Sequence, residues 1–180
     1  MRFGTMASAV LLASGAVWAA AATAAATAPA GGQIYIHATG GQGPAGTIVV
    51  VGAIGDHGTT LTIDKDGKPD SNGNFVKVKL QKGTFEVDST ALNAKMAKRV
   101  PMLNKSTCSF MIAGSDRVTF FNGTGLYRGI SGSAAITIAI GGIGPHYGSG
   151  PEKGRCNLND NAKPVATFGS ITGPGTVAFS

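Results

Sequence analysis

The sequence predicts an all-β protein: an antiparallel β-barrel of about eight strands with one short helix insert and a long loop tethered by a disulfide bond. The 180-residue chain contains 28 glycines, 43% hydrophobic residues and only 13% charged residues. Such a composition is typical of short strands joined by tight turns. Short apolar or alternating runs recur along the chain, which is the pattern of a sandwich or barrel. We favour a barrel because closure removes exposed sheet edges.

Residues 1–28 have the features of a cleaved signal peptide. Arg2 is the only charge before Asp56, and an apolar stretch and small residues with A-x-A sites follow it. The segment is also long enough to span a bilayer, so a retained anchor is the alternative. Its alanine-rich second half and the lack of a following positive cluster favour cleavage. We therefore expect a secreted or cell-envelope protein with a linker at 29–33 and a single β-barrel domain at 34–180.

Cys108 and Cys156 are the only cysteines of the chain. Export would carry them into an oxidising compartment, where paired thiols usually form a disulfide. Two separate buried thiols are the alternative. A bond would contribute about 3–4 kcal/mol by restricting the unfolded chain. It would also tether the loop rich in Gly, Pro and Asn that we predict at 141–163.

Apolar runs and alternation place ten strand segments along the chain. The clearest is 76–80, where apolar residues alternate with lysines, and it reads as a hairpin with 85–88. Clusters of Gly, Asp, Asn and Pro predict turns at 55–58, 64–73 and 173–175. The predicted strands are residues 34–38, 47–54, 59–63, 76–80, 85–88, 107–112, 117–121, 134–140, 165–172 and 176–179.

Residues 89–99 are the one helical segment. A serine or threonine at its start can cap it, and Leu92 and Met96 share a face because they are four residues apart. Cations fall in its last turn, where the helix dipole favours them. Pro101 prevents continuation.

A basic cluster, Lys95, Lys98, Arg99 and Lys105, surrounds this helix. It is either a solvated helix face or a site that adheres to an anionic envelope surface. Without the signal peptide, 14 Lys and Arg remain against 9 Asp and Glu, which also favours acidic surfaces. Nucleic acid is not expected as a partner, because export separates the protein from it.

The segment 123–133, Gly-Thr-Gly-Leu-Tyr-Arg-Gly-Ile-Ser-Gly-Ser, is the most distinctive motif. Its glycines permit tight turns and a bend before the next strand. Tyr127 has a large apolar body with a polar tip, and we expect it to be a buried anchor. Neither a P-loop lysine nor a helix follows, so nucleotide binding is not indicated. The glycines of this barrel turn motif are Gly123, Gly125, Gly129 and Gly132.

This motif resembles the strand-turn signature of the allene oxide cyclase and dirigent superfamily, and most closely that of its small exported bacterial relatives. The hairpin at 82–87 and the position of Cys108 before the motif are also similar to those relatives. The resemblance implies an eight-stranded antiparallel barrel with an apolar interior. Plant members are often trimeric, so the resemblance is compatible with a homo-oligomer. They guide ring closure or radical coupling in a shaped cavity. The helix at 89–99 and the long loop depart from that compact pattern.

We expect the protein to bind a small hydrophobic ligand in its interior. Two alternatives stay open: a cyclase or isomerase that acts in the same cavity, and a cell-envelope interaction protein that uses its basic surface. No catalytic constellation is visible, since no G-x-S-x-G elbow occurs and the three histidines lie far apart. We therefore expect neither a metal site nor a cofactor. The residues that we expect near a ligand cavity are Tyr127, Phe120, His146 and Tyr147.

Overall fold

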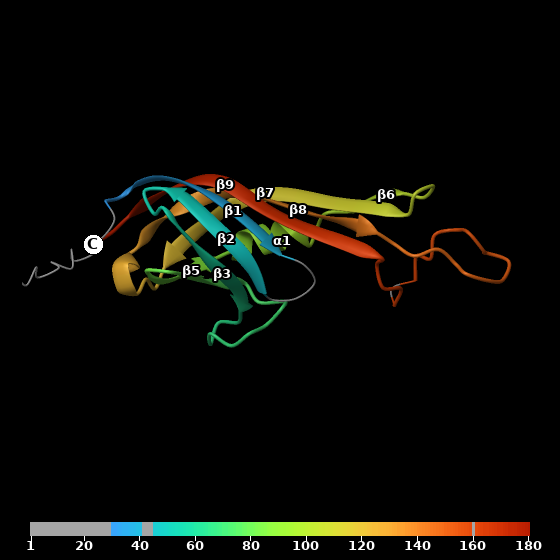
Figure 1. Ribbon diagram of the computed structural model, residues 1–180, viewed down its shortest axis with the longest axis horizontal. Helices are drawn as coiled ribbons and strands as arrows, with labels where there is room; N and C mark the ends of the chain where they lie inside the picture. The colour runs from blue at the N-terminus through green and yellow to red at the C-terminus, as the bar shows by residue number, and fades with distance from the viewer. Residues whose placement is uncertain (1–29, 41–44, 160) are drawn as a thin grey trace, which may run out of the picture.

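Eight antiparallel strands close into a barrel, and the longest of them continue past it as a projecting sheet (Figure 1). This computed structural model describes residues 30–40, 45–159 and 161–180, so the predicted signal peptide lies outside the described residues. The elements are β1 (Gly32–Gly40), β2 (Ala45–Gly52), β3 (Asp56–Ile63), β4 (Phe75–Leu80), β5 (Gly83–Asp88), α1 (Thr90–Met96), β6 (Met102–Asn104), β7 (Ser109–Phe121), the 3₁₀ turn η1 (Gly125–Tyr127), β8 (Ser131–Ile143) and β9 (Ala166–Ala178).

The barrel wall follows the order β5, β4, β3, β2, β1, β9, β8 and β7. A short antiparallel pairing of β5 with β7 then closes the circle, through Glu86 with Phe121, Val87 with Phe120 and Asp88 with Thr119. The predicted all-β antiparallel barrel with one helix insert is therefore confirmed. β6 stands outside the barrel and pairs only with the beginning of β7.

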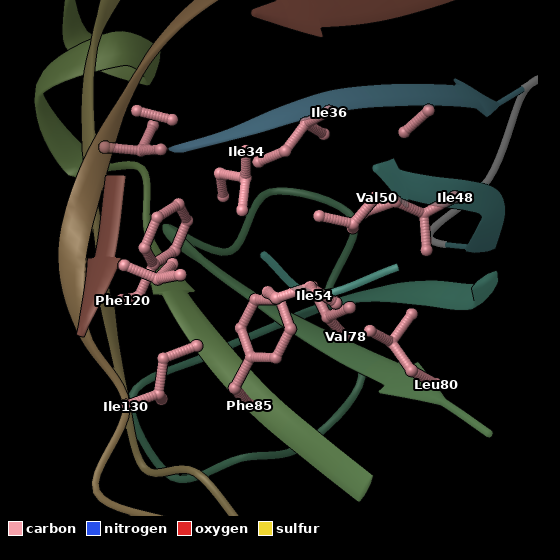
Figure 2. Packing of buried hydrophobic residues seen from close by; sticks show 14 of the residues in the cluster. Ile34, Ile36, Ile48, Val50, Ile54, Val78, Leu80, Phe85, Phe120 and Ile130 are labelled. Atoms are coloured by element: carbon pink, nitrogen blue, oxygen red, sulfur yellow. The ribbon is translucent and has the colours of Figure 1, made fainter. Parts of the chain in front are cut away.

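Alternation of side chains places the apolar half of each barrel strand in one shared interior. In β1, Ile34, Ile36 and Ala38 are buried, while the residues between them are exposed. Figure 2 shows side chains from β1, β2, β4, β5 and β7 converging, with Phe85 and Phe120 among them. Burial of such a side chain contributes about 1.5–3 kcal/mol, so this core is the main stabilising element of the barrel.

Unequal strand lengths give the molecule its elongated shape. β7, β8 and β9 each have 13 residues, whereas β4 and β5 have 6. At about 3.3 Å per residue, the long strands run well beyond the rim set by the short ones. We call residues 97–111 and 140–168 the tip. It includes β6 and the long connection after β8, and it lies opposite the C-terminus (Figure 1).

The two strands predicted at 107–112 and 117–121 are one continuous strand, β7. The intervening Ala-Gly-Ser-Asp resembles a turn, but Gly114 and Ser115 pair with Ile138 and Thr137 of β8. A Cβ on Gly114 would lie 2.6 Å from the sulfur of Met96. The glycine therefore makes room for α1 to pack on the strand, and it does not turn the chain.

The turn predicted at 173–175 is also wrong, because β9 passes through it without a break. A Cβ on Gly173 would lie 2.0 Å from the carbonyl oxygen of Ala135, so only glycine allows this approach of β8. Proline lacks an N–H group to donate. The ladder between β8 and β9 accordingly skips Pro174 and resumes at Thr172 with Thr137.

Other boundaries shift for local reasons. The turn predicted at 55–58 is wrong because Asp56 and His57 already pair with β2. The helix is shorter than the predicted 89–99: it runs from Thr90 to Met96, and the chain then leaves for β6. Ser89 does not cap the helix, since its hydroxyl donates to the carbonyl of Asn74. β8 reaches Ile143, so the connection to β9 covers 144–165 rather than 141–163.

The predicted disulfide joins Cys108 to Cys156 across a sequence separation of 48 residues. Cys108 precedes β7, and Cys156 lies in the connection 144–165. An isolated bridge between Cys156 and His146 and the hydrogen bond from the Gly144 N–H to the Cys108 carbonyl hold the same region. The bond is consistent with an oxidising or extracellular location, and it ties the long connection to the tip.

We predict that the double variant Cys108→Ser, Cys156→Ser loses about 4 kcal/mol of unfolding free energy, because the crosslink closes a long loop in the unfolded chain. Urea unfolding under non-reducing conditions measures this loss. Adding a dithiol should lower the wild-type midpoint and leave the variant unchanged. Equal midpoints for the two proteins without reductant would contradict the prediction.

Candidate functional site

A buried tyrosine–aspartate pair seals the end of the barrel away from the tip. Tyr127 is fully buried and donates its hydroxyl to Oδ2 of Asp56 at 2.5 Å. Asp56 also accepts the backbone N–H of His57 at 2.7 Å and of Lys82 at 3.1 Å. Every oxygen of this carboxylate therefore has a partner, as a buried charge requires. Tyr127 is thus the buried anchor that the sequence predicts.

The barrel turn motif places Tyr127 in this position. η1 follows Gly123, where a Cβ would lie 1.7 Å from the Tyr127 carbonyl oxygen. Gly129 has a φ of +72°, a conformation that favours glycine. Two hydrogen bonds dock the motif on the β4–β5 hairpin at the sealed end of the barrel. The Thr124 N–H donates to the Thr84 carbonyl at the start of β5, and the Leu126 N–H donates to the Lys82 carbonyl in the turn before it.

Both members of the pair have shifted pKa values. Burial by itself raises the pKa of Asp56, but the hydrogen bonds from Tyr127 and from the backbone of His57, Lys82 and Gln81 outweigh it and hold the pKa below its ordinary value. Burial, and then the bond to Asp56, raises the pKa of Tyr127 well above its ordinary value. The pair is therefore an ionised carboxylate held by a neutral phenol over the whole physiological range.

Aromatic rings form the floor of the interior above this pair. Phe85 meets Phe120 edge-on with ring centroids 5.8 Å apart, and meets Tyr127 in the same manner at 5.9 Å. Edge-to-face contacts of this kind add about 0.5–1.5 kcal/mol beyond the buried area. Figure 2 shows Phe85, Phe120 and Ile130 near one another in the core.

A cavity of about 110 Å³ lies above Phe85, inside the barrel. Its wall is apolar except for three hydroxyl-bearing residues, Thr60, Thr62 and Ser89, and none of the residues that line it is ionisable. The aliphatic and aromatic lining consists of Ile36, Ala38, Ile48, Val76, Val78, Phe85, Val87, Leu92, Val118, Ile136 and Ile171.

A hollow of about 390 Å³ lies next to this cavity at the barrel mouth. Thr60, Thr62 and Ile171 line both spaces, so the two lie next to each other and share these residues as a wall. Phe110 and Ile138 extend the apolar lining outward along β7 and β8. Between the aromatic floor and the tip the lining of the two spaces is therefore mostly apolar, and Thr60 and Thr62, which we call the neck, lie where the spaces adjoin.

Helix α1 forms one wall of this cavity. Leu92 is almost fully buried and lines the cavity, and Met96 contacts Gly114 on β7. Lys95 pairs with Asp116 of β7 at 3.5 Å. The shared helix face predicted for Leu92 and Met96 is thus the face that covers the barrel.

The four residues that we expected near a cavity lie in two separate places. Phe120 and Tyr127 belong to the floor and the sealed end, whereas His146 and Tyr147 lie in the connection at the tip. None of the four is among the residues that line the cavity or the mouth hollow. His146 places Nε2 3.1 Å from the sulfur of Cys108. This histidine and the two cysteines have ligand atoms within 4.8 Å of one another, but the disulfide occupies both sulfurs.

Sequence reasoning missed the residues that line the neck. Thr60 and Thr62 alternate with Leu61 and Ile63, and this alternation indicates a strand with one polar face but not that the polar face points inward. In β3 the threonines face the interior opposite Val78 and Val76, while Ile63 is buried beneath the turn at 64–73. The inward direction of the hydroxyls depends on register, which the sequence does not display.

Comparisons with family models, curated protein sequences and solved structures find no match to this chain. The resemblance to the allene oxide cyclase and dirigent superfamily therefore stays a prediction. Within the described ranges, no helix has the length and apolar character needed to cross a bilayer.

We predict that Asp56→Asn destabilises the protein at neutral pH and that its deficit shrinks in acid. The folded pKa of Asp56 is lowered, so its stabilising contribution is present above the unfolded pKa of about 3.9 and is lost as the pH falls through the lower folded value. Urea unfolding of both proteins from neutral pH down through this window tests it. A deficit that is independent of pH would contradict the assignment.

Tyr127→Phe and Tyr127→Ala should separate the two contributions of this side chain. The phenylalanine variant removes one bond to a charged group, which is worth about 1.5–3 kcal/mol. The alanine variant also leaves a cavity and should cost more than the phenylalanine variant, about 3–5 kcal/mol from lost packing. Denaturant unfolding measures the loss of unfolding free energy in each variant. Equal losses would show that packing of the Tyr127 ring does not stabilise the fold.

Proposed function

We propose that this barrel binds a small hydrophobic ligand, with the apolar end of the ligand in the interior cavity. The observation that carries the proposal is an apolar cavity above Phe85 that lies next to a hollow at the mouth, with Thr60 and Thr62 lining both. The inner part, about 110 Å³, is of the order of the ~150 Å³ engineered cavity that takes up benzene. The mouth hollow, about 390 Å³, falls in the ~300–1,000 Å³ range of ligand pockets.

The lining favours binding over a cyclase or isomerase reaction. General acid–base catalysis needs an ionisable group within hydrogen-bond reach of the reacting atom, and the cavity lining offers only the hydroxyls of Thr60, Thr62 and Ser89. The Ser89 hydroxyl already donates to the carbonyl of Asn74. Two threonine hydroxyls at the neck suit a ligand with a polar group between its buried end and its outer part.

Export fits this role. The predicted signal peptide at 1–28 would deliver the protein to the cell envelope or the medium, and the disulfide fits an oxidising compartment. A carrier outside the cytoplasm would shield apolar molecules from water, where they are poorly soluble.

We predict that the exported protein binds the neutral fluorophore N-phenyl-1-naphthylamine at one saturable site. Ala38→Leu should weaken this binding at least tenfold, because Ala38 lines the cavity and the added carbons occupy it. Ala135→Leu is the matched control, since Ala135 lies on the exposed side of β8. Fluorescence titration gives the affinities, and thermal unfolding checks that each variant folds. Equal affinities for the folded variants would place the fluorophore outside the barrel.

Native mass spectrometry of protein recovered from the medium and envelope of its own host complements this titration. Extra mass that disappears on denaturation would identify the ligand. The same spectrum reports the oligomeric state. Protein that carries no extra mass and does not bind the fluorophore would refute the proposal.

A further inference from the structure

The tip carries most of the large apolar side chains that are exposed among the described residues. Twelve large hydrophobic side chains are exposed in the described part of the chain, and all but three of them lie on the tip. Phe168 is 53% exposed and Met102 is 62% exposed, with Met111 and Ile143 nearby. Single exposed apolar residues are common, but a cluster of this kind marks an interaction surface.

The projecting sheet is apolar on both of its faces. Phe110 covers Gly142 on the face that continues the barrel interior, with its ring 2.9 Å from the place of a Cβ. Phe168 covers the neighbouring Gly141 in the same way, at 2.6 Å. Since successive residues of a strand point to opposite faces, the two rings lie on opposite sides of the sheet. A protein partner docked on one face would leave the other in water, whereas a lipid surface entered by the tip would cover both.

The tip also holds nearly all of the excess positive charge. Its sequence contains six Lys and Arg against two Asp and Glu, while the rest of residues 30–180 contains eight against seven. Lys98, Arg99, Lys105, Lys153 and Lys163 are exposed. Among the described residues, none of these five forms an ion pair within 4.0 Å. The charge is therefore available to an external anion.

We propose that the tip docks the protein on the surface of an anionic lipid bilayer. The cations would meet the headgroups, and Phe168, Met111 and Met102 would enter the boundary between headgroups and acyl chains. Each cation held at such a surface strengthens binding about fivefold, and buried apolar area adds to it. Backbone without internal hydrogen bonds is not tolerated in the hydrocarbon core, so the connection 144–165 limits docking to interfacial depth.

The disulfide assembles this surface. It fixes Cys156 beside Cys108, and the Val165 N–H donates to the Ile143 carbonyl at 2.7 Å where the connection returns to the sheet. The exposed Leu158 and Val165 of the connection are thereby held on the same end as Met102. This inference stands apart from ligand binding, because it uses the outside of the tip and not the interior cavity.

Flotation of the exported protein with vesicles tests the docking. Vesicles of phosphatidylcholine mixed with phosphatidylglycerol should bind it, and pure phosphatidylcholine should bind it far less. The triple variant Lys98→Gln, Arg99→Gln, Lys105→Gln should weaken binding about a hundredfold. Lys77→Gln, Lys79→Gln, Lys82→Gln is the matched control, because it also removes three charges and these exposed lysines lie on the barrel away from the tip. Equal losses in both sets would indicate attraction by net charge alone and would overturn the proposal.

A single tryptophan distinguishes insertion from surface adhesion. Trp18 is the only tryptophan and lies in the predicted signal peptide, so the wild-type spectrum gives the background. Phe168→Trp should shift its emission to the blue on mixed vesicles and be quenched by brominated acyl chains, whereas Tyr35→Trp on the outer barrel wall should do neither. Binding without quenching at Phe168→Trp would mean adhesion to any polyanion. Self-association by sedimentation that Phe168→Ala abolishes, without vesicle binding, would identify a second copy as the occupant. Either result refutes bilayer docking.

Discussion

The short pairing of β5 with β7 is the contact on which the rest of the architecture depends. Only three residue pairs join these strands, yet they convert an open sheet into a barrel without free barrel edges. Phe85 on β5 and Phe120 on β7 reinforce the closure by meeting edge-on inside it. Because β5 ends at Asp88, the remainder of β7 has no strand partner on that side within the barrel. Helix α1 covers it, through Met96 on Gly114 and the pairing of Lys95 with Asp116.

This closure makes the two ends of the barrel different. At one end the chain returns through η1, and Tyr127 holds Asp56 in a fully partnered buried pair. A buried charge tolerates little change in its surroundings, since losing one partner leaves the carboxylate underbonded. At the other end the strands diverge in length, and the space between α1, β3 and β9 is lined by apolar groups and hydroxyls. Buried hydrogen bonds to a charged group are thus concentrated at the sealed end, and accessible apolar space at the mouth.

The sequence predicts the architecture well and the site poorly, for physical reasons. In β4, between Phe75 and Leu80, apolar residues alternate strongly with lysines. This alternation follows from the local strand geometry and does not depend on which strands pair with β4. Turns were wrongly predicted around Gly114 and Pro174. Glycine and proline are common in turns, but glycine also occurs where another chain segment packs closely on a strand, and proline where a strand lacks a ladder hydrogen bond. The partner of Tyr127 lies 71 residues away, so burial of the ring was predictable from its motif while the choice of Asp56 was not. The neck hydroxyls are set by the register of β3, which depends on all neighbouring strands.

The mouth of the barrel and the tip share several residues. These shared residues connect the proposed ligand binding with the proposed bilayer docking, although neither proposal depends on the other. Phe110, Thr167 and Phe168 line the mouth hollow and also a second hollow, on the tip, that Met102, Met111 and Ile143 line with them. The interior cavity is small, so a ligand with a chain longer than one ring or branched group must extend through the mouth. Exposing such a chain to water costs about 0.8 kcal/mol per CH₂. A protein docked by its tip would hold the mouth against the bilayer, so the chain could pass between membrane and barrel while remaining in apolar surroundings.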